Sequence, residues 1–161
     1  MYSTPYDKEI ELFCRKVVEK LGPKSIILYG SMATKRFGAG SDIDIIVISE
    51  NLPENFLQRL QLLFELNPTT APIEPLGYKP NEFLKMIRSR HPTALYAVSE
   101  GKLLYDDGFF DKAKEVFEKV KNEFDMVRIE HGWEARAITS KISNKLENSR
   151  QKNLIASDTR Q

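Results

Sequence analysis

The sequence contains very little cysteine and histidine, and this scarcity excludes several kinds of site. Cys14 is the only cysteine, so the chain forms no intrachain disulfide and no cysteine-cluster metal site. His91 and His131 are the only histidines, which makes a zinc site a poor prediction. Cys14 falls in an apolar helical stripe, so we predict a core residue rather than a reactive thiol.

Long hydrophobic runs and a signal-peptide pattern are also missing. No stretch approaches the roughly 18 apolar residues that a membrane-spanning helix needs. The first residues, MYSTPYDKEIELF, include acidic side chains where a signal peptide has cations followed by an apolar run. We therefore expect a cytoplasmic protein that has no membrane partner.

The chain has no large excess of charge of either sign. It has 24 basic and 23 acidic side chains, a net charge of +1, so no overall field attracts a polyanion or an anionic membrane. Residues 1–126 contain 17 basic and 19 acidic groups (net −2), and residues 127–161 contain 7 and 4 (net +3). This mildly basic tail is too weak to indicate nucleic acid as a partner by itself.

What the sequence does contain is a series of short apolar strands separated by amphipathic helices. Its 161 residues suffice for one domain with a sizeable core. The alternation predicts an α/β (α+β) domain with a small mixed sheet flanked by helices. The prolines in the third predicted strand favour an edge position. The predicted strands are 25–30, 42–49, 72–78 and 103–105, and the predicted helices are 6–21, 53–66, 80–90, 92–100 and one capped by Asp111.

Beyond Val127 the pattern becomes weaker. Ile138, Ile142 and Leu146 keep helical spacing, but residues 148–161 are polar and are predicted to be frayed or disordered. We therefore predict a domain over residues 1–126 and a helical or partly disordered extension over residues 127–161.

Two aspartates stand at the start of the most apolar predicted strand. Side chains two residues apart in a strand point to the same face, so Asp42 and Asp44 are expected to project side by side. Two carboxylates this close raise each other's pKa unless a cation lies between them. A divalent metal is the simplest solution, and Mg²⁺ characteristically takes one or two carboxylates together with substrate phosphates. The alternative is a solvated pair at a sheet end.

The residues before the aspartates are typical of a phosphate site. The first strand ends at Gly30, where a ligand could approach the backbone closely, and Ser31 begins a predicted helical turn over residues 31–37. The Ser31 hydroxyl and the first amides of this turn are donors for an anion. Arg36 is a weaker candidate for binding phosphate, because cationic side chains in loops are usually solvated. For these groups to lie near Asp42, the first two strands must be antiparallel neighbours.

Gly30-Ser31, ten residues and then Asp42-Ile43-Asp44 form the signature G-S-x10-D-x-D, and the chain resembles the DNA polymerase β-like nucleotidyltransferase superfamily, in particular its minimal members. The resemblance implies the nucleotidyltransferase fold and transfer of a nucleoside monophosphate from ATP or another NTP to a hydroxyl group. It also implies two Mg²⁺ ions and a third carboxylate, for which Glu74 is the candidate. Glu74 could instead be a surface acid of an edge strand.

Two functions remain open from the sequence. The first is an Mg²⁺-dependent nucleotidyltransferase, of adenylyl specificity, with Asp42, Asp44 and Glu74 as metal-binding and catalytic residues. The resemblance implies small helical HEPN-type proteins as partners, some of which are adenylylated in an antitoxin-like reaction. The second is a non-catalytic nucleotide-binding module that neutralises a partner by complex formation.

Overall fold

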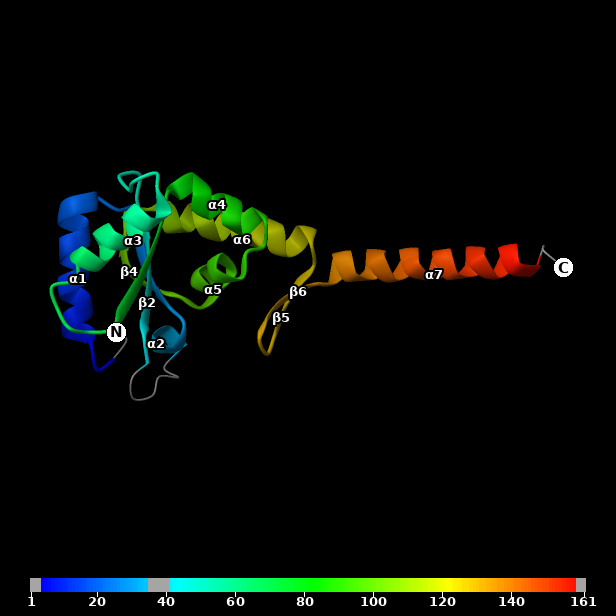
Figure 1. Cartoon of the computed structure of the whole chain (residues 1–161), viewed down its shortest axis with the longest axis horizontal. Coiled ribbons are helices and arrows are strands. Elements are labelled where there is room, and N and C mark those ends of the chain that lie inside the picture. The colour runs from blue at the N-terminus through cyan, green and yellow to red at the C-terminus, as the bar shows by residue number, and fades with distance from the viewer. Residues whose placement is uncertain (1–3, 35–40, 159–161) are drawn as a thin grey trace. The chain divides into compact units, whose positions relative to one another are not determined.

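The computed structural model describes residues 4–34 and 41–158 (Figure 1). The chain divides into two compact units, Met1–Phe117 and Glu118–Gln161. The first unit holds a four-stranded sheet, and the second holds a two-stranded hairpin and a long helix. The division after residue 126 that the sequence suggests stays a prediction.

A mixed four-stranded sheet forms the centre of the first unit. Its order is β3-β2-β1-β4, in which β1 (Ser25–Tyr29) pairs antiparallel with both β2 (Ile43–Ile48) and β4 (Lys102–Asp106). Strand β3 (Ile73–Tyr78) pairs parallel with β2 and lies at the edge. The predicted α+β fold class, the antiparallel pairing of the first two strands and the edge position of the third are confirmed.

In the described part of the chain, six helices accompany this sheet, and their starts differ in places from the sequence prediction. Helix α3 begins three residues after Pro53, because Asn55 is its cap and accepts a hydrogen bond from the Gln58 backbone N–H. Helix α6 is capped by Asp106 and Asp107, not by Asp111, which lies in its first turn. The bounds are α1 Asp7–Leu21, α2 Ser31–Thr34, α3 Phe56–Glu65, α4 Pro80–Arg88, α5 Pro92–Glu100 and α6 Phe109–Glu123.

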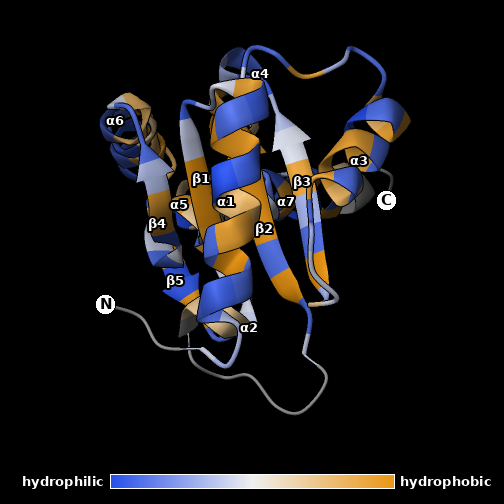
Figure 2. Ribbon diagram, turned by 90° about the vertical axis from the view of Figure 1, so that its left-hand side faces the viewer, coloured by the Kyte–Doolittle hydropathy of each residue, from blue (hydrophilic) through white to orange (hydrophobic). Residues whose placement is uncertain are grey.

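The sheet is apolar on both faces beyond its first residues. Helix α1 crosses one face over β1 and β2, which Figure 2 colours as hydrophobic. On this face the side chains of α1 pack with alternate strand residues such as Ile26 and Ile45. Residues of the opposite face, among them Ile27, Ile46 and Ile48, are also fully buried. Because β2 is covered on both sides, its first residues are where polar side chains can reach solvent.

One buried cation fixes the edge strand. The Arg59 side chain of α3 is only 4% exposed. Its guanidinium donates to the carbonyl oxygens of Pro53 and Gly77 and forms an ion pair with Glu82 of α4, with an Nη2–Oε1 distance of 3.0 Å. Burial alone would raise the pKa of Glu82, but the hydrogen bond and charge of Arg59 and the backbone N–H of Lys79 lower it. Strand β3 is therefore tied to two helices through one guanidinium.

The second unit contains a hairpin that the sequence does not predict and a helix that is longer than the helical spacing at Ile138, Ile142 and Leu146 indicates. Strands β5 (Met126–Ile129) and β6 (Gly132–Ala135) form an antiparallel hairpin, and α7 (Arg136–Asp158) follows at once. Residues 148–158, predicted to be frayed or disordered, belong to this helix. Among the described residues, no helix combines the length and the apolar character needed to cross a membrane.

Candidate functional site

The sheet brings two of the predicted carboxylates into one row with a tyrosine. Asp44 lies opposite Tyr29 of β1 and opposite Glu74 of β3. Directly opposed residues of neighbouring strands share a face, with Cβ atoms about 5 Å apart. The row Tyr29–Asp44–Glu74 therefore crosses three strands on one face. Asp42 is exposed just before β2 begins.

Gly30 lies directly against this row. Its φ is +70°, a conformation that L side chains rarely adopt, and a Cβ at this position would lie 2.5 Å from Oδ2 of Asp44. The close approach that the sequence predicts at Gly30 is therefore made in this structure by the Asp44 carboxylate. The end of β1 and the start of β2 meet as the spacing predicts.

Neighbouring carboxylate charges raise the pKa values of Asp44 and Glu74. Burial raises the pKa of Asp44 to about 6, and the charges of Glu74 and Asp42 contribute to the rise. The pKa of exposed Glu74 is raised by desolvation, by the charge of Asp42 and by a side-chain hydrogen bond with Asp42. A group of acids that raise each other's pKa is stabilised either by protons or by a cation placed between them.

The oxygen atoms of Asp42, Asp44 and Glu74 are suitable ligands for a hard divalent cation that also binds phosphate. All are carboxylate oxygens, which Mg²⁺ prefers. Within residues 4–34 and 41–158, however, no three or more His, Cys, Asp or Glu side chains converge closely enough to hold a metal by themselves. Mg²⁺ usually binds one or two carboxylates and takes its remaining ligands from substrate phosphates and water. The residues therefore suit an ion that arrives with a nucleotide.

The predicted phosphate donors adjoin the carboxylates, in so far as the structure describes them. Helix α2 begins at Ser31, directly after Gly30. Met32 and Ala33 are buried in the core beneath α1, and they anchor this turn at the end of β1. Arg36 lies outside the described residues, as does the remainder of the helical turn predicted to residue 37.

Tyr29 is a member of the site that sequence reasoning missed. Burial raises its pKa, and the charges of Asp44, Tyr78 and Glu74 raise it further, so the group remains a neutral phenol. A signal was available in the sequence. Once the first two strands are antiparallel and joined near Gly30, the residue before Gly30 must lie beside the aspartate strand.

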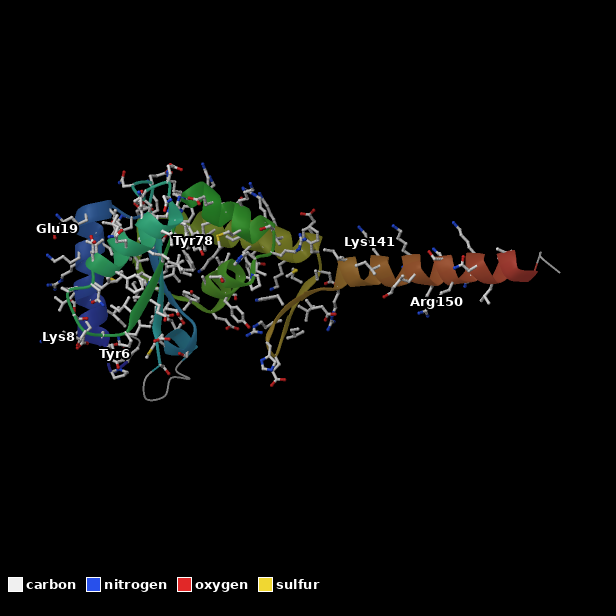
Figure 3. All side chains as sticks on the ribbon, in the orientation of Figure 1. Tyr6, Lys8, Glu19, Tyr78, Lys141 and Arg150 are labelled. Atoms are coloured by element: carbon white, nitrogen blue, oxygen red, sulfur yellow. The ribbon has the colours of Figure 1, made fainter. Side chains whose placement is uncertain are left out.

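Two hollows are lined by residues other than Asp42, Asp44 and Glu74. One, of about 520 Å³, is lined by Tyr6 and Lys8 of the N-terminal segment (Figure 3) and by residues 69–72. The other, of about 400 Å³, lies between α1 and β4 and includes Cys14. Burial and the neighbouring Glu11 raise the pKa of Cys14 to about 12, so it remains a thiol. The sequence predicts a core residue, but Cys14 is only partly buried and packs against the edge of the core rather than inside it. Neither hollow contains a predicted site residue.

Comparison with models of known protein families identifies the family of this chain. The family model "Polymerase beta, Nucleotidyltransferase" matches residues 14–110, a range that contains Gly30, Ser31, Asp42, Asp44 and Glu74. Among proteins of curated function, none matches the chain in sequence.

Several solved structures are similar at low identity. A toxin–antitoxin complex with AMP-PNP has a chain 21% identical to this one, with 71% of this chain and 92% of that chain covered and a TM-score of 0.46. A double mutant of the MntA–HpeT toxin–antitoxin pair has a chain 18% identical to this one, with 71% of this chain and 92% of that chain covered and a TM-score of 0.47. A complex of a tri-AMPylated HEPN toxin from Shewanella oneidensis with an MNT antitoxin has a chain 18% identical to this one. The match covers 73% of this chain and 88% of that chain, with a TM-score of 0.42.

Proposed function

The chain belongs to the polymerase beta nucleotidyltransferase family, and on this premise we propose that it transfers AMP from ATP to a hydroxyl group with the help of Mg²⁺. The family makes the chain a nucleotidyltransferase, whereas the donor nucleotide, the metal and the acceptor are proposed. One observation carries the proposal: Asp44 lies against Gly30 and opposite Glu74, at the end of the sheet where helix α2 begins.

We assign the metal to Asp42 and Asp44, and we assign the role of the base to Glu74. When bound, Mg²⁺ would neutralise charge on the triphosphate and on the attacking oxygen. The Ser31 hydroxyl and the backbone N–H groups beside it donate to the phosphates. Gly30, which has no side chain, lets the backbone at this turn come close to both Asp44 and the nucleotide.

The transfer itself requires one proton acceptor. The acceptor hydroxyl oxygen forms a bond to the α-phosphorus, the bond from that phosphorus to the bridging oxygen breaks, and pyrophosphate leaves. Glu74 takes the hydroxyl proton, because it is exposed to solvent and lies opposite Asp44 in the same row. Tyr29, which remains a neutral phenol, can donate a hydrogen bond to an anionic oxygen in the same row.

For the acceptor we propose a protein hydroxyl, on a small helical partner of HEPN type. The support is the sequence resemblance to the minimal nucleotidyltransferases, together with charge. Residues 1–126, which contain the whole family match, have a net charge of −2, and this does not favour a polyanionic acceptor such as tRNA.

The test is transfer of radiolabel from α-labelled ATP to a co-expressed HEPN-type protein, in the presence of Mg²⁺ and after its removal with a chelator. We expect labelling that needs Mg²⁺ and disappears in Asp42→Asn and Asp44→Asn. Glu74→Gln should bind ATP within a few fold of the parent but transfer about 100-fold more slowly, as for loss of a general base. Glu19→Gln, an exposed acid on α1, is the matched control and should change nothing.

Metal-dependent ATP binding without transfer to any partner that the chain stably binds would contradict the enzymatic proposal. That result would favour the non-catalytic module. Unchanged transfer by Glu74→Gln would contradict only the role of Glu74.

A further inference from the structure

Tyr29 and Glu74 lie at the two ends of the row that contains Asp44. Figure 2 shows β1, β2 and β3 side by side, and the strand register places Tyr29 of β1 and Glu74 of β3 on either side of Asp44 of β2. The row lies on the face of the sheet away from α1, because the residues next to its members in the chain pack in one cluster with α1. Neighbouring strands are about 4.8 Å apart, so the backbones of Tyr29 and Glu74 are about 10 Å apart.

The Tyr29 hydroxyl is a hydrogen-bond donor that this structure leaves uncommitted. The side chain is half-buried, as is that of Asp44. Within residues 4–34 and 41–158, the Tyr29 hydroxyl forms no hydrogen bond with another residue. A tyrosine hydroxyl keeps its proton at neutral pH and can donate it to one acceptor. An anionic oxygen that binds beside Asp44 would therefore find a donor in Tyr29.

The position of the proposed base gives the transfer a direction along the row. In phosphoryl transfer the attacking and leaving oxygens lie roughly in line, on opposite sides of the phosphorus. Glu74 takes the proton of the attacking hydroxyl, so the attacking oxygen enters at the β3 end. The leaving oxygen then lies toward the β1 end, where Tyr29 is. Ser31, whose hydroxyl we assign to the phosphates, follows Tyr29 by two residues and lies at this same end.

We propose that the Tyr29 hydroxyl donates a hydrogen bond to the pyrophosphate leaving group as the bond from the α-phosphorus to the bridging oxygen breaks. This inference rests on the proposed transfer of AMP with Glu74 as the base. Tyr29 keeps its proton throughout: the proton of the acceptor hydroxyl goes to Glu74, and pyrophosphate leaves as an anion. Negative charge accumulates on the leaving oxygen during the transfer, so the hydrogen bond is stronger in the transition state and in bound pyrophosphate than in bound ATP.

The first test varies the leaving group. Tyr29→Phe removes the hydroxyl and keeps the ring, and Tyr105→Phe is the matched control, because Tyr105 lies on the α1 side of the sheet. AMP transfer to a co-expressed HEPN-type protein is measured by mass spectrometry with ATP and with two analogues, whose β,γ-bridging oxygen is replaced by CF2 or by CH2. The leaving group of the CF2 analogue is less basic than pyrophosphate, and that of the CH2 analogue is more basic.

The variants should differ in their response to this series. Tyr29→Phe should transfer AMP from ATP about tenfold more slowly, with KM for ATP within a few fold of the parent. The loss should be smaller with the CF2 analogue and larger with the CH2 analogue, because a more basic leaving group gains more from a hydrogen-bond donor. Tyr105→Phe should match the parent with all three donors. A merely structural role of Tyr29 would slow transfer equally with all three.

The second test needs no acceptor protein. Calorimetric titration measures the binding of pyrophosphate and, separately, of AMP in the presence of Mg²⁺. Tyr29→Phe should bind pyrophosphate about tenfold more weakly than the parent, as for loss of a hydrogen bond to a charged group. It should bind AMP as the parent does, because AMP has the transferred phosphate but no leaving group. Thermal unfolding checks that Tyr29→Phe and Tyr105→Phe remain folded.

Two results would overturn the inference: equal pyrophosphate affinity in the parent and Tyr29→Phe, or equal slowing of transfer with all three donors. Normal transfer by the parent that Tyr29→Phe does not slow would contradict this inference and leave the proposed function intact. Weaker pyrophosphate binding by Tyr29→Phe, in a chain that transfers AMP to no partner, would contradict the proposed function and support the contact between Tyr29 and pyrophosphate.

Discussion

At the residue scale, the geometry of Gly30 determines where the Asp44 carboxylate can lie. A Cβ added to Gly30 would lie 2.5 Å from Oδ2 of Asp44, so there is no room for even one methyl group unless Asp44 moves. Replacing Gly30 therefore has two effects: backbone strain at a positive φ, and displacement of a carboxylate that we assign to the metal.

We predict that Gly30→Ala loses about 1–3 kcal/mol of stability and most of its Mg²⁺-dependent ATP binding. Gly108→Ala is the matched control, because Gly108 also has a positive φ, +114°, but has no atom within 4 Å of its Cβ position. Urea unfolding should show a loss of stability in both variants because both have backbone strain, and calorimetric titration with ATP should show lost binding only in Gly30→Ala. Normal binding by Gly30→Ala would contradict the assignment of Asp44.

Asp44 also makes stability depend on pH. Its pKa is about 6 in the folded chain, above the ordinary value of 3.8, so the folded state binds more protons than the unfolded state between these values. Stability therefore falls as pH rises from about 4 to about 6 in the absence of divalent cations, and the loss persists at higher pH.

Asp44→Asn removes this ionisation, so we predict that the variant is more stable than the parent at pH 7 with a chelator present, and that the difference disappears near pH 4. Melting temperatures of both proteins at pH 4, 5, 6 and 7 test this, because titrating groups that do not interact with Asp44 cancel in the difference. A variant less stable than its parent at pH 7 would show that the carboxylate has a stabilising partner.

The residues of the site differ in how far the sequence could predict them. Asp42 and Asp44 were predictable because side chains two apart in a strand share a face. Glu74 could be placed on the third strand, but its position opposite Asp44 depends on a parallel register that no local pattern determines. The role of Tyr29 follows only after the antiparallel pairing is known.

At the scale of elements, the strands and the long helices of the first unit follow from apolar periodicity. The ends of the helices follow from capping residues, but the start of α6 shows that the sequence does not always identify the right cap. The sequence predicts Asp111 as the cap, but in the structure the Phe109 and Phe110 backbone N–H groups donate to Asp107 and Asp106 instead. The β5–β6 hairpin was not predicted, because its strands have only four residues each and are too short to show a clear alternation of apolar and polar side chains.

The contact between α3, β3 and α4 depends on Arg59. We predict that Arg59→Met destabilises the chain by about 2–4 kcal/mol, because the Gly77 carbonyl loses a donor and Glu82 loses its cation. Glu82→Gln should also destabilise the chain, because it leaves the buried Arg59 cation without its counter-charge, although an amide oxygen can still accept from the Lys79 N–H. Urea unfolding measures both. A loss below about 0.5 kcal/mol in Arg59→Met would mean that the ion pair contributes no net stability.

At the scale of the whole molecule, the family match and the candidate site lie together in the first unit. The match covers residues 14–110, and the carboxylates, Gly30 and Tyr29 all fall inside it. The second unit, with its hairpin and basic helix, lies outside the match. A ligand of the site should therefore stabilise the first unit directly.

We predict that ATP and Mg²⁺ together raise the melting temperature, while either alone has little effect, because the carboxylates and the phosphates complete one set of ligands. At 100 times the dissociation constant the gain is about 2.7 kcal/mol, or several degrees for a chain of this size. Hydrogen exchange should slow in β2 and β3 and remain unchanged in α7. The Asp42→Asn variant should show no rise in melting temperature, and Glu19→Gln should show the same rise as the parent.

An equal rise in melting temperature with ATP alone would contradict a metal held jointly by the protein and the nucleotide. Slowed hydrogen exchange in α7 would show that nucleotide binding affects the second unit.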